Sequence, residues 1–170
     1  MLLLMGLGGC GGYMQGNLAL ARGDYRQAEQ LFQEILVQNP EDATARRRLA
    51  MTYFYMGRDL DPSYYARSVQ EFRRIGEIRD PTPEEQFHHG FALIGEGRRA
   101  EGFGLLKNFS YPRQFRTQQF VRERAAQLES DPDLTPIEIF TQMERAWKEG
   151  EQEDLRERLD ERHDPWDIGG

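Results

Sequence analysis

The chain has few of the side chains that build disulfides and metal centres. It contains one cysteine and three histidines in 170 residues. A lone cysteine excludes an intramolecular disulfide and any metal site that needs a cysteine pair. His88 and His89 are adjacent, so on a helix their side chains would diverge by about 100° and could not hold one ion together. His163 lies in a charged tail. We therefore expect neither a metal site nor a cofactor.

The chain also lacks an excess of basic residues, a long apolar run and a catalytic motif. Lys and Arg number 22 against 29 Asp and Glu, a net charge of −7, whereas general binding to phosphate backbones needs a basic surface. The apolar run Leu2–Leu7 is far too short to span a bilayer. The glycine-rich stretches lack the strand and lysine of a phosphate-binding loop. The sequence therefore predicts neither a nucleic-acid partner nor an enzyme.

The chain is instead rich in helix-forming residues, and residues 16–40 contain a pattern that recurs further on. Gly23 can adopt the positive φ needed where a helix stops. Asp24 is placed to cap the next helix, and Gln27 completes a pair resembling a capping box. Proline cannot continue a helix, so the second helix should end before residue 40. The pattern consists of Gly16, Gly23, Tyr25, Ala28, Phe32, Ile35 and Pro40.

Two further copies follow at nearly constant spacing. Phe72 lies 40 residues after Phe32, and Leu106 lies 34 residues after Phe72. Gly57 lies 34 residues after Gly23, which predicts that both glycines end a helix. The second copy then has six additional residues between its glycine and its phenylalanine. An ordinary helical bundle with glycines at these positions by chance is the alternative.

This pattern resembles the tetratricopeptide repeat, a helix-turn-helix unit of about 34 residues. The resemblance implies an all-α fold, a right-handed α-solenoid of stacked helix pairs. The expected layout is a residual leader at 1–12, a helical domain at 13–162 and a tail at 163–170. Within the domain we expect repeats at 13–40, 43–81 and 83–109, an extra helix at 113–129 and a degenerate helix pair at 135–162.

The degenerate pair is predicted from a second match in spacing. Thr135 follows Thr82 by 53 residues, and Gly150 follows Gly97 by the same interval. Both threonines begin a capping box, so Gly150 is expected to turn the chain between two helices. The highly charged end of this segment is typical of a solubilising cap on a solenoid.

In tetratricopeptide proteins the first helix of each pair lines a concave groove that holds a protein or peptide partner. Carried over by spacing, this implies a groove with arginine, methionine and aromatic side chains, which are types enriched in protein interfaces. The expected partner-binding residues are Tyr13, Asn17, Thr44, Arg47, Arg48, Met51, Tyr55, Phe87, His88 and Phe91.

Arg47 and Arg48 are the expected electrostatic anchor of this groove. With Tyr55 on the same helix face they suit an extended or helical peptide that has an acidic residue. The alternative is that the basic cluster 46–48 is a solvated face that pairs with Glu41 or Asp42.

The N-terminal sequence Leu7-Gly8-Gly9-Cys10 resembles a bacterial lipobox, in which the cysteine is lipidated and becomes the mature N-terminus. With the repeats, this resembles the small tetratricopeptide lipoproteins of Gram-negative envelopes, which assist assembly of outer-membrane machinery. That resemblance implies a non-catalytic scaffold anchored through Cys10 in the outer membrane and facing the periplasm. A frayed N-terminus with a free thiol is the alternative, and it would suit a soluble cytoplasmic adaptor or co-chaperone.

Overall fold

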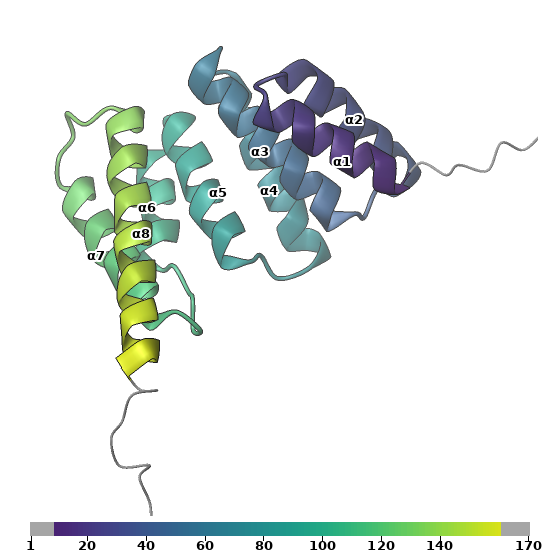
Figure 1. Ribbon diagram of the computed structural model, residues 1–170. Coiled ribbons are helices and arrows are strands. Elements are labelled where there is room, and N and C mark those ends of the chain that lie inside the picture. The colour runs from purple at the N-terminus through teal and green to yellow at the C-terminus, as the bar shows by residue number, and fades with distance from the viewer. Residues whose placement is uncertain (1–8, 161–170) are drawn as a thin grey trace, which may run out of the picture.

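The computed structural model describes residues 9–160, with side chains described within 11–160. This part of the chain forms eight α-helices and no strand (Figure 1). The expected leader residues 1–8 and the tail 163–170 lie outside the described residues. The helices are α1 (Gly9–Ala21), α2 (Tyr25–Gln38), α3 (Ala43–Asp59), α4 (Tyr64–Ile78), α5 (Pro83–Gly95), α6 (Arg99–Lys107), α7 (Phe115–Glu129) and α8 (Pro136–Asp160).

The helices pack as consecutive pairs: α1 with α2, α3 with α4, α5 with α6, and α7 with α8. Each pair also contacts the next, through α2 and α3, α4 and α5, and α6 and α7. In Figure 1 the pairs run in chain order from α1 and α2 at one end to α7 and α8 at the other. The arrangement confirms the predicted all-α solenoid of stacked helix pairs.

The recurring apolar positions form the core between the helices of each pair. Phe32 and Leu106 are fully buried, and Phe72 is 3% exposed. Gly16 lies against the ring of Phe32, where a Cβ would come within 2.7 Å of the ring. The same spacing therefore places a large side chain opposite its neighbouring helix three times, as predicted. Gly23, at φ +77°, turns the chain between α1 and α2, also as predicted.

Gly57, in contrast, does not end a helix, so its predicted equivalence to Gly23 is wrong. Its φ is not positive, and α3 continues past it to Asp59. A Cβ at Gly57 would lie 2.8 Å from the ring of Tyr65 on α4. This glycine thus serves a close side-chain contact, and part of the insertion lengthens α3 while the rest connects it to α4.

The predicted helix pair at the C-terminal end of the domain is also wrong, because residues 136–160 form one continuous helix, α8. Gly150 lies inside this helix, where α7 and α8 approach most closely. A Cβ there would be 2.4 Å from Thr117 Cα on α7. The glycine that suggested a turn therefore permits backbone contact between two helices.

The side chain of Asp154 then joins α8 to the start of α7. Its carboxylate accepts hydrogen bonds from the backbone amides of Arg116 and Thr117, both at 2.9 Å, and from the Thr117 hydroxyl at 2.7 Å. Gln114, the residue preceding α7, makes no side-chain cap. Because the first amides of a helix need acceptors from elsewhere, α8 supplies the cap that α7 lacks.

Near its other end, α8 packs over the aromatic side chains of α3 and α5. The ring of Phe140 lies 5.4 Å from that of Phe54 and 4.8 Å from that of Phe91, centroid to centroid. It also lies 6.2 Å from Tyr65. In Figure 1 this helix runs beside α5. The C-terminal helix therefore covers the faces of α5 that the repeat pattern assigned to the groove.

We expect Gly102→Ala and Gly104→Ala on α6 to change stability in opposite directions. A Cβ at Gly102 would lie 2.6 Å from the carbonyl oxygen of Gly90 on α5, so the helices would have to separate. A Cβ at Gly104 would meet no atom within 4 Å, and alanine is favoured over glycine inside a helix by about 1 kcal/mol. Urea denaturation measures the free energy of unfolding. We expect it to rise by about 0.5–1 kcal/mol in Gly104→Ala and to fall by about 1–3 kcal/mol in Gly102→Ala. Shifts of the same sign would contradict this packing.

Candidate functional site

Three adjoining cavities form a groove along α1, α3, α5 and α8, which we call the concave groove. The first, about 510 Å³, lies between α1 and α3. The second, about 200 Å³, lies between α3 and α5 and shares Arg48 with the first. The third, about 350 Å³, lies between α5 and α8 and shares Glu84 and His88 with the second. The groove is therefore one surface built from the first helices of three pairs and the C-terminal helix.

The first cavity brings together three of the predicted partner-binding residues: Asn17 from α1, and Arg48 and Tyr55 from α3. Asn17 Oδ1 and Arg48 Nε are both buried, and neither has a hydrogen-bond partner within the protein. Burial, followed by the nearby charge of Arg47, lowers the pKa of Arg48 from its usual value. A buried polar atom without a partner costs free energy, so the wall of the first cavity has a donor and an acceptor whose hydrogen bonds are unmade.

Tyr55 is held in this cavity by stacking. Its ring lies parallel to that of Tyr25 at 6.3 Å, and the guanidinium of Arg58 lies 4.8 Å from its centroid. The Tyr25 hydroxyl and Arg58 both donate hydrogen bonds to Asp59. Burial raises the pKa of Tyr55, so its hydroxyl remains protonated and able to donate at neutral pH. The cavity therefore presents a fixed aromatic face beside an unpaired cation.

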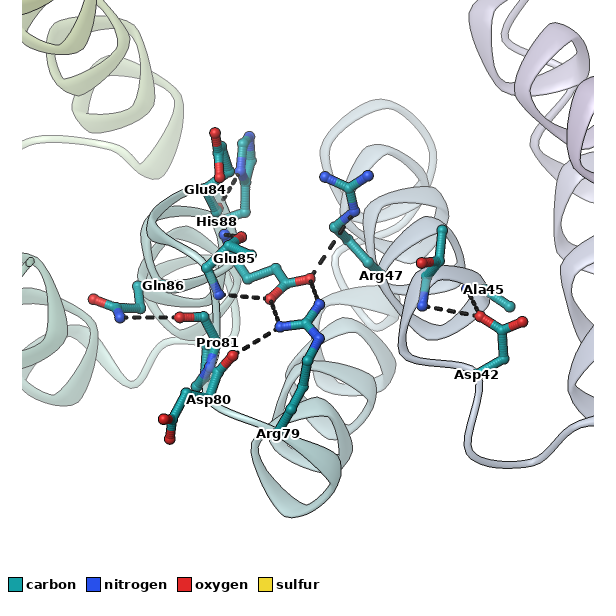
Figure 2. Close-up of polar contacts among 12 residues, drawn as sticks. Asp42, Ala45, Arg47, Arg79, Asp80, Pro81, Glu84, Glu85, Gln86 and His88 are labelled. Carbon is teal, nitrogen blue, oxygen red and sulfur yellow. Dashed lines mark hydrogen bonds and ion pairs between the residues drawn. The ribbon is translucent and has the colours of Figure 1, made fainter. Parts of the chain in front are cut away.

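Arg47 and Arg48, the predicted anchor, both line the second cavity, and Arg47 also lies beside an acidic side chain of the protein itself. Arg47 Nε lies 4.0 Å from Glu85 Oε1 on α5. Arg79 donates two hydrogen bonds to the same carboxylate, at 2.9 and 2.7 Å. Figure 2 shows Arg79 and Arg47 on either side of Glu85. Arg46 donates to Glu71 on α4 at 2.8 Å, so it pairs with neither of the acidic residues suggested by the alternative interpretation of the basic cluster.

Glu85 is the buried centre of this charge cluster, with a side chain only 1% exposed. Its carboxylate also accepts the backbone amide of Thr82, and the Thr82 hydroxyl accepts the amide of Glu85, which completes the predicted capping box of α5. Burial alone would raise the pKa of Glu85. The hydrogen bonds from Arg79 and Thr82 and the charges of both arginines outweigh burial and lower that pKa. An ionised carboxylate on α5 is thus hydrogen-bonded to Arg79 and Thr82 and lies beside Arg47 of α3.

Phe87 and Phe91 are largely covered, which corrects their predicted exposure to a partner. Phe91 is fully buried, and Phe87 is 4% exposed. They are covered because α8 occupies their side of α5: Phe91 packs on Phe140, and Phe87 packs on Trp147 at 4.7 Å. Only a small edge of Phe87 reaches the third cavity.

The remaining predicted residues lie at different depths. His88 and Met51 are half-buried and line the second cavity. His88 Nδ1 is 2.7 Å from the carbonyl oxygen of Glu84, and burial lowers its pKa, so it is neutral at pH 7. Tyr13 lies beside Asp42 at the start of α3, where burial and that carboxylate raise its pKa. Thr44 is exposed in the first turn of α3. Tyr13 and Thr44 line none of the three cavities.

Several groove residues were missed by reasoning from the sequence. The repeat pattern gives Tyr25 only a packing role, Arg58 falls in the insertion, and Trp147 lies outside the three repeats. The signal available for Arg58 was its place three residues after Tyr55, which puts both on one helix face. No local pattern could have placed α8 against α5, because that contact joins residues about fifty positions apart.

The described residues contain no helix long and apolar enough to cross a membrane. They also contain no group of three or more His, Cys, Asp or Glu side chains arranged to hold a metal ion. His88 and His89 point apart: the first faces the groove, and the second stacks on Phe72 at 5.6 Å. The side chain of Cys10, the predicted lipidation site, lies outside the described side chains.

We expect Glu85→Gln to destabilise the fold in a pH-dependent way. The substitution leaves Arg79 without its carboxylate partner. Removing one member of a buried ion pair lowers the free energy of unfolding by about 3 kcal/mol or more. We expect a smaller loss here because the Arg79 side chain is 38% exposed to solvent. The folded-state pKa of Glu85 is below the ordinary glutamate value of 4.5. The stability that the carboxylate provides is therefore complete above that ordinary value and is lost as the pH falls through the folded pKa. Urea denaturation at pH 7 and at pH 3 measures this. An equal difference between wild type and variant at both pH values would contradict the assignment.

Comparison with protein-family models matches residues 13–61 to a family described as tetratricopeptide repeat. Comparison with curated proteins and with solved structures gave no match. The matched segment spans most of α1, all of α2 and α3, and it contains Asn17, Arg48 and Tyr55 of the first cavity. Repeats of this kind generally bind protein partners and are typically non-catalytic. Together with the stacked helix pairs, the match shows that residues 13–61 are similar to tetratricopeptide repeats.

Proposed function

We propose that the protein is a non-catalytic scaffold that holds a segment of a partner protein in the concave groove. The observation that supports this most strongly is the first cavity. It presents a buried donor, Arg48 Nε, and a buried acceptor, Asn17 Oδ1, that have no partner within the protein. A bound polypeptide has both carbonyl and amide groups, so it would satisfy the two atoms once their side chains turn toward the cavity.

The aromatic face of Tyr55 beside these atoms supplies the apolar contact that such a segment needs. Tyrosine and arginine are the side chains most often found at the energetic centre of protein interfaces. Here Tyr55 is held in place before binding, because its ring contacts both Tyr25 and the guanidinium of Arg58. Little side-chain entropy would be lost on binding, which favours affinity.

Site-specific photo-crosslinking tests this proposal. We expect p-benzoylphenylalanine in place of Tyr55 to capture a defined partner in cells, because that side chain faces the cavity. The matched control places the same photo-crosslinker at Gln70, which is exposed on α4. Arg48→Gln should weaken binding of the captured partner roughly 30-fold, corresponding to about 2 kcal/mol. Arg73→Gln, the same change at an exposed position of α4, should leave binding unchanged. Equal capture at positions 55 and 70 would locate the interface elsewhere.

We propose further that the scaffold is anchored by a lipid on Cys10 in the bacterial envelope, at the outer membrane facing the periplasm, and assists assembly of an outer-membrane complex. The sequence Leu7-Gly8-Gly9-Cys10 supports this. Because one cysteine is present, the assignment has a single possible acceptor in the sequence.

Metabolic labelling with an alkyne analogue of palmitate tests the anchor. When the gene is expressed in a Gram-negative host, the wild-type protein should take up the label and fractionate with membranes. Cys10→Ser should remove both properties. An unlabelled wild-type protein in the soluble fraction would instead support a cytoplasmic adaptor that uses the same groove.

A further inference from the structure

The third cavity of the groove is aromatic at its base and acidic at its rim. It lies between α5 and α8 and has a volume of about 350 Å³. Phe87 and Trp147 form its apolar part, and Glu84, Glu144 and Glu151 surround them. The repeat pattern assigns Phe87 and His88 to the groove but gives no chemistry for their ligand, and the other side of this cavity, Glu144, Trp147, Lys148 and Glu151, comes from α8.

Trp147 is the fixed part of the cavity. Its ring contacts Phe87 at 4.7 Å, Phe109 at 5.4 Å and Tyr111 at 5.7 Å, centroid to centroid. The residue is half-buried, so these contacts leave part of the indole open to the groove. A tryptophan ring is the aromatic surface that attracts cations most strongly.

The three carboxylates converge on this ring from two helices. Glu144, on α8, is near enough to His88 of α5 and Tyr55 of α3 to act on the pKa of each. Glu84 and Glu151 both act on Tyr111, which adjoins Trp147. The carboxylates therefore surround the same space although they are distant in the sequence.

These carboxylates are exposed, and none of them forms an ion pair with another described residue within 4 Å. Glu85, one position after Glu84, is different because Arg79 and Arg47 neutralise it. Lys148 is the one cation that lines the cavity, so three negative charges face one positive charge. An excess of negative charge therefore lies beside an open aromatic surface.

We propose that this cavity binds a lysine or arginine side chain of the partner protein, stacked on Trp147 and paired with Glu144 and Glu151. The inference depends on the proposed scaffold function and specifies the chemistry of its partner. A cation over an indole and a charge-assisted hydrogen bond to a carboxylate reinforce each other when both are partly shielded from water. An acidic or purely apolar side chain would gain neither interaction.

Fluorescence of Trp147 reports directly on this cavity. Trp166→Phe makes Trp147 the single tryptophan, since the chain has two. The probe is a capped peptide with two arginines separated by glycine and serine. The matched peptide carries citrulline, which has the same shape without the charge. We expect a saturable change in Trp147 emission with the arginine peptide and at least a tenfold weaker response with the citrulline peptide.

Charge-neutral variants distinguish a site from general attraction to an acidic protein. Glu144→Gln with Glu151→Gln should weaken the arginine peptide at least tenfold. Glu41→Gln with Glu123→Gln removes the same charge from exposed positions outside the cavity and should change the affinity less than twofold. Thermal melts of both pairs confirm folding. Equal weakening by both pairs, or no saturable change in emission, would overturn the proposal.

The photo-crosslinking result at position 55 separates this inference from the scaffold proposal. Capture at Tyr55 that persists in the Glu144→Gln, Glu151→Gln variant at wild-type level overturns the cation site and leaves the scaffold in place. Loss of affinity for the captured partner in that variant, but not in the Glu41→Gln, Glu123→Gln control, supports both.

Discussion

The insertion of Phe140 between α3 and α5 determines what the concave groove is. This side chain, from α8, contacts Phe54, Tyr65 and Phe91, which belong to three different helices of two repeats. Burying an aromatic ring of this size contributes several kcal/mol. The contact therefore closes the solenoid at its C-terminal end, and the third cavity of the groove follows from the position of α8.

The position of α8 depends in turn on features at its other end. Gly150 lets its backbone approach Thr117, and Asp154 caps the first turn of α7. A longer side chain at position 150 would push α8 away from α7, and the carboxylate would no longer reach the amides. With the helix held at Gly150 and at Phe140, its intervening residue Trp147 is brought over Phe87. The aromatic base of the third cavity is therefore a consequence of contacts on both sides of it.

The fold could be predicted from the sequence where each signal was local and repeated. Phe32, Phe72 and Leu106 recur at one position of the repeat, and a buried position of this kind depends on helix geometry alone. Glycines were less informative about where helices end, because a glycine can either adopt a positive φ at a turn or allow close contact between helices. Gly23 serves the first, while Gly57 and Gly150 serve the second. The spacing could not tell these apart, so both of the latter were interpreted wrongly as turns.

The candidate site was predicted in part for the same physical reason. Asn17, Arg48 and Tyr55 come together as expected because they lie on the first helices of adjacent, regular repeats. Phe91 was placed on an open surface because its cover, Phe140, is 49 positions later in the chain. The contact between Arg47 and Glu85 was likewise not predicted, because the two residues are remote in sequence. Long-range contacts of these kinds are invisible to periodicity.

The charges left after these internal contacts give the groove two ends of opposite sign. Glu85 and Arg47 lie beside each other near its middle. Among the described residues, Arg48 has no ion-pair partner in the cavity between α1 and α3, and Glu144 and Glu151 have none between α5 and α8. A polypeptide lying along the groove would meet a cation first and carboxylates second, so reversing its direction would place like charges together. Because like-charge contacts disfavour wrong partners and wrong orientations, this separation of charge supplies a basis for directional binding that the overall acidity of the chain does not reveal.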